Sequence, residues 1–361
     1  MRGSFPIPAR LARLAACFIR TREARRAGHA LGCAQRARRS QDVPASAMRG
    51  HRVTGKRQQA PRNAALAYET NNYSPRLAPF YEPAAGFWPP LAEQLEAAAQ
   101  AGFGCVVLDS GSLETCMRQG GSLPGLRARL DVLALHCLAV AEISIVEDTE
   151  SVIGAARPLL DAVRALGAPF LQASVMGVAG NCLASARALE QLAAAAGATV
   201  ALEFLPFGAV NSIAAAQAFV RAAELCNTRL LLDSWHFFQG PSSWEQLRGL
   251  WPQQIAYLQF SDHAAIGVEH ALHATVNERL LPGEGVFDLA RFCAELRSIG
   301  FDGVLSCEVL SSAWRERTPA QYALAEFAAA RRYWGDDAGN RGRGLHRALI
   351  ADRGTATDDN P

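Results

Sequence analysis

The chain has 361 residues, half of them apolar, and a formal net charge of +2 at pH 7. This length suits one large α/β domain or two ordinary ones, and no apolar run approaches the roughly 20 residues of a membrane-spanning helix. The charge is asymmetric: residues 1–62 hold fourteen Arg and one Lys against two acidic residues, while the remainder holds 21 basic and 32 acidic residues. The acidic main body argues against a nucleic-acid partner, and we expect no membrane partner either.

The basic segment at residues 1–62 precedes the first predicted strand. We expect it to be a disordered leader or a misassigned start, because Met48 offers a later start. A mitochondrial-type presequence is the alternative, since residues 11–26 are rich in arginine and poor in acids. Residues 336–361, rich in Gly, Arg and Asp, are expected to form a disordered tail. The folded domain is therefore predicted to span residues 63–335.

Short apolar runs alternate with helix-like segments after the basic segment. The predicted strands are 64–69, 105–109, 137–143, 170–174, 199–203, 230–233, 255–260 and 304–308. The predicted helices are 91–101, 124–135, 152–166, 183–196, 213–226, 244–250, 288–299 and 319–334. Several of these helices end at a glycine just before the next strand, which is the expected C-terminal stop. Eight such repeats predict a single (β/α)8 TIM barrel. An open Rossmann-like sheet is disfavoured, because no Gly-x-Gly-x-x-Gly follows an early strand.

Lysine and cysteine usage narrows the chemistry. Lys56 is the only lysine and lies in the basic segment, so the predicted barrel has no amine for a Schiff base. Carbonyl polarisation must then come from a metal or from arginine and histidine. The nine cysteines are scattered without ligand-like spacing, which favours buried thiols in a reducing compartment. We therefore expect a cytoplasmic protein.

Four successive predicted strands end in an oxygen-bearing side chain, namely Glu203, Asp233, Gln259 and Glu308. A buried carboxylate or amide is costly without a partner, and the C-terminal ends of parallel barrel strands converge on one mouth. A single such residue is more often a helix cap or a solvated rim residue. Four in succession instead indicate a shared divalent cation. His236, three residues after Asp233, is placed to bond substrate hydroxyls or shuttle protons.

Four short motifs lie near these strand ends. They are Asp-x-x-His at 233–236, Gln-Phe-Ser-Asp at 259–262, Arg-Leu-Leu-Pro-Gly-Glu-Gly at 279–285 and Gly-Phe-Asp-Gly at 300–303. Together they resemble the xylose isomerase-like TIM-barrel superfamily of sugar phosphate isomerases and epimerases, over roughly residues 64–334. The Pro-Gly-Glu-Gly element and the final Glu308 are its most distinctive parts.

The resemblance implies roles for individual residues. The metal ligands it implies are Glu203, Asp233, Gln259 and Glu308. His236 and Arg279 would contact the substrate, and Glu203 and Glu308 would also be the acid/base pair of an epimerase. Many epimerases of the superfamily carry a histidine where this chain has Gln259, so the ligand set here becomes all-oxygen, which favours one Mn²⁺ or Mg²⁺.

Glutamine at this position also resembles the 3-dehydroshikimate dehydratase branch of the superfamily. In that branch His236 would be the base and Glu308 the acid for the leaving group. The expected function is a metal-dependent sugar or sugar phosphate isomerase or epimerase that abstracts a proton next to a carbonyl through a metal-stabilised enediolate. The alternatives are a lyase that removes water from a hydroxy keto acid and a non-catalytic metal-binding barrel.

DNA-repair endonucleases of related fold are disfavoured. The resemblance to those enzymes would imply several zinc ions bound mainly by histidines, and none of the four strand-end residues here is a histidine. The expected partner is therefore a small sugar, sugar phosphate or keto acid. Homo-oligomer formation is left open.

Overall fold

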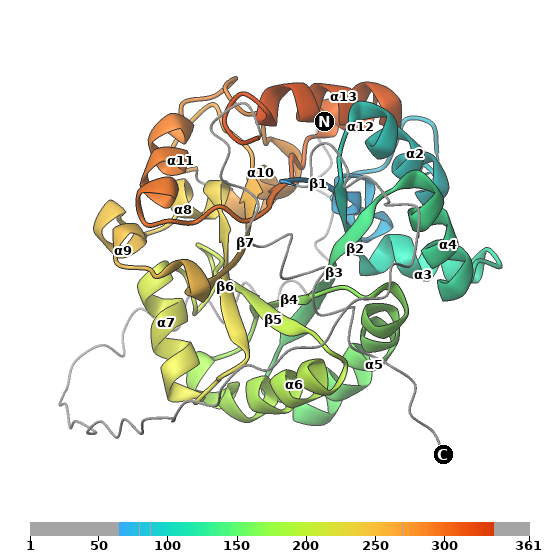
Figure 1. Cartoon of the computed structure of the whole chain (residues 1–361). Coiled ribbons are helices and arrows are strands. Elements are labelled where there is room, and N and C mark those ends of the chain that lie inside the picture. The colour runs from blue at the N-terminus through green and yellow to red at the C-terminus, as the bar shows by residue number, and fades with distance from the viewer. Residues whose placement is uncertain (1–64, 79, 87, 269, 336–361) are drawn as a thin grey trace, which may run out of the picture. The chain divides into compact units, whose positions relative to one another are not determined.

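The computed structural model describes residues 65–335, except 79, 87 and 269. Within this part of the chain, eight parallel strands pair in chain order, and the first strand closes onto the eighth. Figure 1 shows the helices as a ring around this barrel. The predicted (β/α)8 barrel is confirmed. The basic segment and the tail that the sequence predicts lie outside the described residues.

All eight predicted strands are present. They are β1 Leu66–Glu69, β2 Cys105–Asp109, β3 His136–Ile145, β4 Phe170–Val175, β5 Thr199–Glu203, β6 Thr228–Asp233, β7 Ile255–Phe260 and β8 Leu305–Cys307. The eighth strand is shorter than predicted, so Glu308 follows β8 instead of ending it. The third strand is longer than predicted, and its pairing with β4 shifts register between Val140 and Ile143.

The eight predicted helices are also present. They are α2 Leu91–Ala101, α4 Leu123–Leu133, α5 Thr149–Leu166, α6 Leu183–Ala195, α7 Ile213–Ala222, α9 Trp244–Arg248, α11 Leu289–Ser298 and α13 Pro319–Ala330. Four further helices lie in the connections after strands: α3 Ser110–Arg118, α8 Ser234–Gln239, α10 Ala271–Asn277 and α12 Ser312–Arg315. The short 3-10 turns are η1 Thr70–Tyr73, η2 Pro75–Leu77, η3 Ala179–Asn181 and η4 Pro252–Gln254. Among the described residues, no helix is long and apolar enough to cross a membrane.

Helix α5 illustrates how local sequence produces the outer ring. Asp148 caps its N-terminus by accepting from the backbone N–H groups of Glu150 and Ser151. Gly167 ends it in the left-handed conformation, with φ of 62°. The apolar residues between recur at helical spacing and are buried, so one face packs against the barrel.

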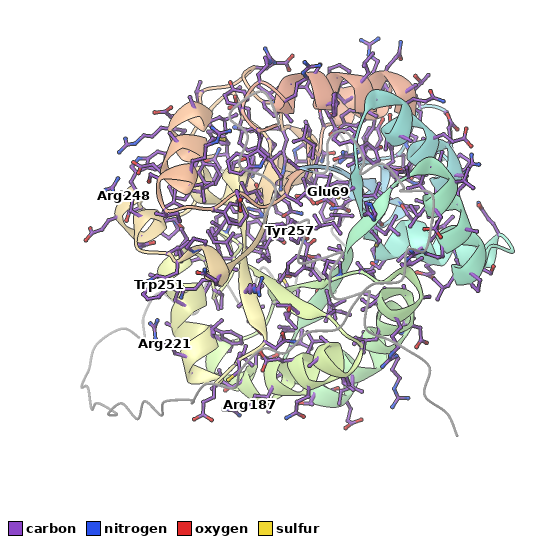
Figure 2. All side chains as sticks on the ribbon, viewed as in Figure 1. Glu69, Arg187, Arg221, Arg248, Trp251 and Tyr257 are labelled. Atoms are coloured by element: carbon purple, nitrogen blue, oxygen red, sulfur yellow. The ribbon has the colours of Figure 1, made fainter. Side chains whose placement is uncertain are left out.

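Alternation along the strands sorts side chains between the barrel interior and the outer helices. Tyr257 packs with Leu231 and Phe170 in an interior cluster, whereas Leu258 and Phe260 belong to the large cluster shared with the helices. Tyr257 therefore faces the barrel interior, and its neighbours along β7 face the helices. Glu69 and Tyr257 are labelled near the centre of the barrel in Figure 2, while Arg187, Arg221, Arg248 and Trp251 lie at its periphery.

Candidate active site

The predicted ligand residues lie at the C-terminal end of the barrel on four consecutive strands. Glu203 ends β5, Asp233 ends β6, Gln259 lies in β7 and Glu308 follows β8. Asp233 is in register with Gln259, so these two side chains start from the same level of the sheet. All four side chains are buried. A buried carboxylate without a partner is costly, so their contacts define the chemistry of the site.

His236 lies between two of these carboxylates. Its Nε2 is 2.9 Å from Glu203 Oε1 and 3.4 Å from Asp233 Oδ2. Asp233 positions it, because the Trp235 backbone N–H donates to Asp233 Oδ1 at 2.7 Å and starts helix α8. Burial lowers the pKa of His236, but Asp233 and Glu203 together outweigh burial and raise that pKa above its usual value. Glu203, Asp233 and His236 form a group that could hold a metal ion, with one ligand atom from each within 4.8 Å of the others.

Arg279 bridges the carboxylates of Asp233 and Glu308. Its Nη1 lies 2.8 Å from Asp233 Oδ2 and 3.1 Å from Glu308 Oε2. Its Nε and Nη2 donate to the backbone carbonyl and the hydroxyl of Thr275, at 2.7 and 2.9 Å. The guanidinium is buried, and each of its three nitrogens donates to a protein acceptor. Arg279 therefore supplies positive charge between Asp233 and Glu308.

Gln259 contacts a carboxylate that was not predicted to belong to the site. Its Nε2 donates to Oε1 of Glu69, the last residue of β1, at 3.2 Å. The Gln259 carbonyl oxygen Oε1 is buried and has no hydrogen-bond partner among the described residues. Burial and the nearby Glu308 raise the pKa of Glu69 well above its usual value. Glu69 carries the same signal as the predicted ligands, an acidic residue at a strand end, and that signal could have found it.

Amide side chains donate hydrogen bonds to two of the carboxylates. Gln172 of β4 donates to Glu203 Oε2 at 2.9 Å, and its own carbonyl accepts from the Tyr257 hydroxyl at 2.9 Å. Asn71, just after β1, donates to Glu308 Oε1 at 2.8 Å. These contacts orient the carboxylates before any ligand arrives, as supporting residues do around metal sites. None of these three donors was predicted, because nothing local in the sequence marks them.

The donor set fits a divalent cation. Glu203, Asp233 and His236 could hold it, and the buried Gln259 Oε1 on the strand beside Asp233 lacks a partner among the described residues. Carboxylate and amide oxygens and imidazole nitrogens are all ligands of divalent cations. The Arg279 guanidinium contacts two of these carboxylates, and His236 Nε2 contacts Asp233 and Glu203.

Besides Glu69, two further carboxyl groups near the site have raised pKa values. Burial raises the pKa of Glu308 to about 7, although Arg279 acts to lower it. Burial and the charges of Glu203 and Glu308 raise the pKa of Glu142, in β3, to about 7. Perturbed groups of this kind cluster at functional sites, because catalysis needs acids and bases that titrate near neutral pH.

Asp262 fixes the Pro-Gly-Glu-Gly element, residues 282–285, by hydrogen bonds to its backbone and to the residues that follow it. Its carboxylate accepts from the backbone N–H groups of Gly283 and Phe287, each at 3.0 Å. Gly285 fits against this carboxylate so closely that a Cβ there would lie 2.3 Å from Asp262 Oδ1. Leu280 pairs with Asp262 through the backbone, which anchors the segment next to Arg279. The motif therefore orders the chain that carries Arg279.

Known proteins resemble this chain in sequence over part of their length. The 3-dehydroshikimate dehydratase of Pseudomonas aeruginosa is 32% identical over 155 residues, which are 43% of this chain and 23% of that protein. The inosose isomerase of Bacillus subtilis is 31% identical over 123 residues, which are 34% of this chain and 43% of that protein. The matched regions thus span less than half of either relative.

Solved structures share the fold. The IolI protein with a bound zinc atom has a TM-score of 0.64 and 19% identity, covering 75% of this chain and 99% of that one. An L-ribulose 3-epimerase has a TM-score of 0.54 and 16% identity, covering 82% of this chain and all of that one. The family model described as xylose isomerase-like TIM barrel matches residues 95–332. The chain therefore belongs to the xylose isomerase-like TIM-barrel family.

Proposed function

We propose that the protein is a divalent-metal-dependent isomerase or epimerase of a sugar, a sugar phosphate or a related polyhydroxylated ketone. The observation that supports this proposal is the buried group of Glu203, Asp233 and His236, which could hold a metal ion, next to the unpartnered amide oxygen of Gln259 on the neighbouring strand. The similarity to inosose isomerases, and the fold shared with an L-ribulose 3-epimerase, support it.

The metal would be held by Glu203, Asp233, Gln259 and Glu308. Bound there, a divalent cation polarises the substrate carbonyl and stabilises the negative charge that develops on its oxygen when the neighbouring proton leaves. The all-oxygen set favours Mn²⁺ or Mg²⁺ over zinc in this chain.

Glu203 and Glu308 are the proposed acid/base pair. They extend from β5 and β8, on different sides of the mouth, so one can remove a proton and the other can return it at the neighbouring carbon or the opposite face. The pKa of Glu308, raised to about 7, suits a group that both accepts and donates near neutral pH. His236 would bond a substrate hydroxyl through the same Nε2 that now contacts Glu203.

Arg279 is proposed to act at the same site, as its place in the sequence motif predicts. Its contacts favour a role in balancing the charge of Asp233 and Glu308. Binding a phosphate or carboxylate of the substrate would require Nη1 to exchange one of these partners. Five of the described cysteines, Cys116, Cys182, Cys226, Cys293 and Cys307, are free thiols, which fits the proposed cytoplasmic location.

A lyase is the second candidate function. The similarity to 3-dehydroshikimate dehydratases and the glutamine in the proposed ligand set favour it. In this reaction His236 would remove the proton, and Glu308 would protonate a departing β-hydroxyl. Both functions begin with removal of a proton next to a carbonyl, and they differ in the proposed base and in the second step.

Proton–deuterium exchange distinguishes these functions. Protein stripped with a chelator and reloaded with Mn²⁺ would be incubated in D2O with ketohexoses, inosose and 3-dehydroshikimate, and followed by NMR. Exchange at the carbon next to the carbonyl without water loss supports an isomerase or epimerase, whereas a dehydrated product supports the lyase. Glu308→Gln with its metal content measured is the control, since the proposal expects turnover to fall while metal remains. Metal binding without exchange or product across the panel would favour a non-catalytic barrel.

A further inference from the structure

The side chains of Glu69 and Gln259 meet across a strand that separates them. Both are fully buried, and Gln259 Nε2 donates to Glu69 Oε1 at 3.2 Å. Strand β8 lies between β7 and β1, with Ser306 in register with Gln259 on one side and Ala67 on the other. The contact is therefore a product of barrel closure.

This contact distinguishes the two ends of the Gln259 amide. A glutamine amide has a donor nitrogen and an acceptor oxygen of nearly the same shape, so its orientation depends on its partners. Glu69 Oε1 accepts the hydrogen bond, which directs Nε2 toward β1. The oxygen Oε1 then points away from Glu69, is buried, and has no partner among the described residues.

We propose that Glu69 is a positioning residue that holds the Gln259 amide with Oε1, and not Nε2, toward the carboxylates of Asp233 and Glu308. The inference rests on the proposed function, because it gives that oxygen a cation to bind. An amide turned the other way would present N–H groups to the cation and lose one ligand. Substituting a residue that orients a metal ligand typically lowers metal affinity by about 10- to 100-fold.

The test measures Mn²⁺ affinity by calorimetry and by the EPR signal of free Mn²⁺. Glu69→Gln keeps the shape of the side chain but introduces an amide that can also donate, so the Gln259 amide is no longer directed one way. Glu69→Asp keeps the carboxyl group but is one methylene shorter and reaches Gln259 less well. We expect each substitution to raise the Mn²⁺ dissociation constant about 10-fold.

Glu326→Gln is the matched control. Glu326 is also fully buried, and its Oε1 accepts from an amide, Asn72 Nδ2, at 2.7 Å. Its second oxygen has no partner among the described residues, as is the case for Glu69. No hydrogen bond joins Glu326 to a proposed metal ligand in the described part of the chain. We expect its loss of charge to change Mn²⁺ affinity by less than about twofold, the scatter allowed for independent sites.

Gln259→Leu tests whether Glu69 acts through the amide. In that background, neither substitution at Glu69 should weaken Mn²⁺ binding further. An equal loss with and without Gln259 would overturn the inference, because Glu69 would then act by its charge alone. Unchanged affinity in both single variants would also overturn it while leaving the metal site intact, whereas a wild-type protein that binds no Mn²⁺ would refute both. Circular dichroism of the metal-free variants reports folding, and if one variant fails to fold the other decides.

Discussion

Nη1 of Arg279 lies 2.8 Å from Oδ2 of Asp233, and both side chains are buried. The same nitrogen lies 3.1 Å from Glu308, so the guanidinium group of Arg279 contacts two of the proposed metal ligands. Removing one partner of a buried pair leaves the others charged and desolvated. Arg279 therefore stabilises the metal-free site and also adds positive charge where the proposal places a cation.

Arg279→Gln should strongly destabilise the metal-free protein. We expect the free energy of unfolding to fall by about 3–5 kcal/mol, because Asp233 and Glu308 lose their buried partner. Urea unfolding in a chelating buffer measures this, and added Mn²⁺ should restore part of the loss by binding the folded state.

The control for this substitution is Arg248→Gln. Arg248 Nη1 lies 2.9 Å from Glu295, but the arginine side chain is 47% exposed. Surface pairs contribute about 0–1 kcal/mol, so this variant should change little. Equal losses in the two variants would contradict the role given to Arg279.

Asp233→Asn should abolish metal binding while preserving the helix cap. The asparagine oxygen can still accept from the Trp235 N–H, so helix α8 should keep its start. Loss of the carboxylate charge should weaken Mn²⁺ binding by at least about 100-fold, the upper end of effects seen around metal sites. Metal content after dialysis measures the effect.

Asp109→Asn is the matched control for Asp233. Asp109 also ends a strand, is buried, and caps a helix by accepting from Ser112 N–H at 3.0 Å. Its other partners include the hydroxyls of Thr70 and Ser74. Metal content should stay at the wild-type level. A fully loaded Asp233→Asn protein would refute the proposed ligand set.

The stability of the metal-free protein should fall as pH rises from about 4.5 to about 7. The pKa of Glu142 is raised from 4.5 to about 7 by burial and by Glu203 and Glu308, so the folded state holds this proton more tightly than the unfolded state. The stabilisation from this proton is complete below 4.5, the pKa of Glu142 in the unfolded chain. It is lost as the pH rises through about 7, the pKa of Glu142 in the folded protein. The slope for one such proton is about 1.4 kcal/mol per pH unit at most.

Glu142→Gln removes this titration. Urea unfolding across the same pH range should show a shallower decline in the variant, because the amide stays neutral throughout. An unchanged slope would show that Glu142 does not hold a proton more tightly in the folded state.

Gly285→Ala should disrupt the Pro-Gly-Glu-Gly element. The added Cβ would lie 2.3 Å from both Asp262 Oδ1 and the His263 backbone carbonyl, so the segment must shift. We expect a loss of about 1–3 kcal/mol, as in other overpacked sites, measured as a lower melting temperature. Gly154→Ala in α5 is the control: nothing lies within 4 Å of its added Cβ, and alanine should stabilise the helix by about 0.5–1 kcal/mol. Equal effects of both substitutions would exclude a steric role for Gly285.

The order of elements could be predicted because each strand–helix unit carries its own apolar pattern and stop signal. Four helices were missed, each in a connection after a strand, and three of them, α8, α10 and α12, span only four to seven residues. Helix α8, for example, spans Ser234–Gln239 and starts on the Asp233 cap. A helix of this length has fewer than two turns of pattern to read.

The site was predictable where a strand end or a short motif marked a residue. Asp233, Gln259 and Glu308 could be located from the ends of single strands, and their shared buried location results from the barrel. The Glu69–Gln259 contact spans 190 residues and depends on how β1 closes against β8. The Gln172–Glu203 contact likewise requires the register of β4 against β5. Sequence spacing carries no information about these distances.

The proposed acid, base and ligand groups stand on strands or immediately beside them, while the connections between strands form the wall around them. A strand-borne carboxylate keeps its place when a neighbouring loop is exchanged, since its position is fixed by sheet pairing. Grafting a connection from another member of the family is therefore a practical route to a new substrate range in this barrel. We expect such a graft to leave the strand-borne members of the proposed ligand set in place.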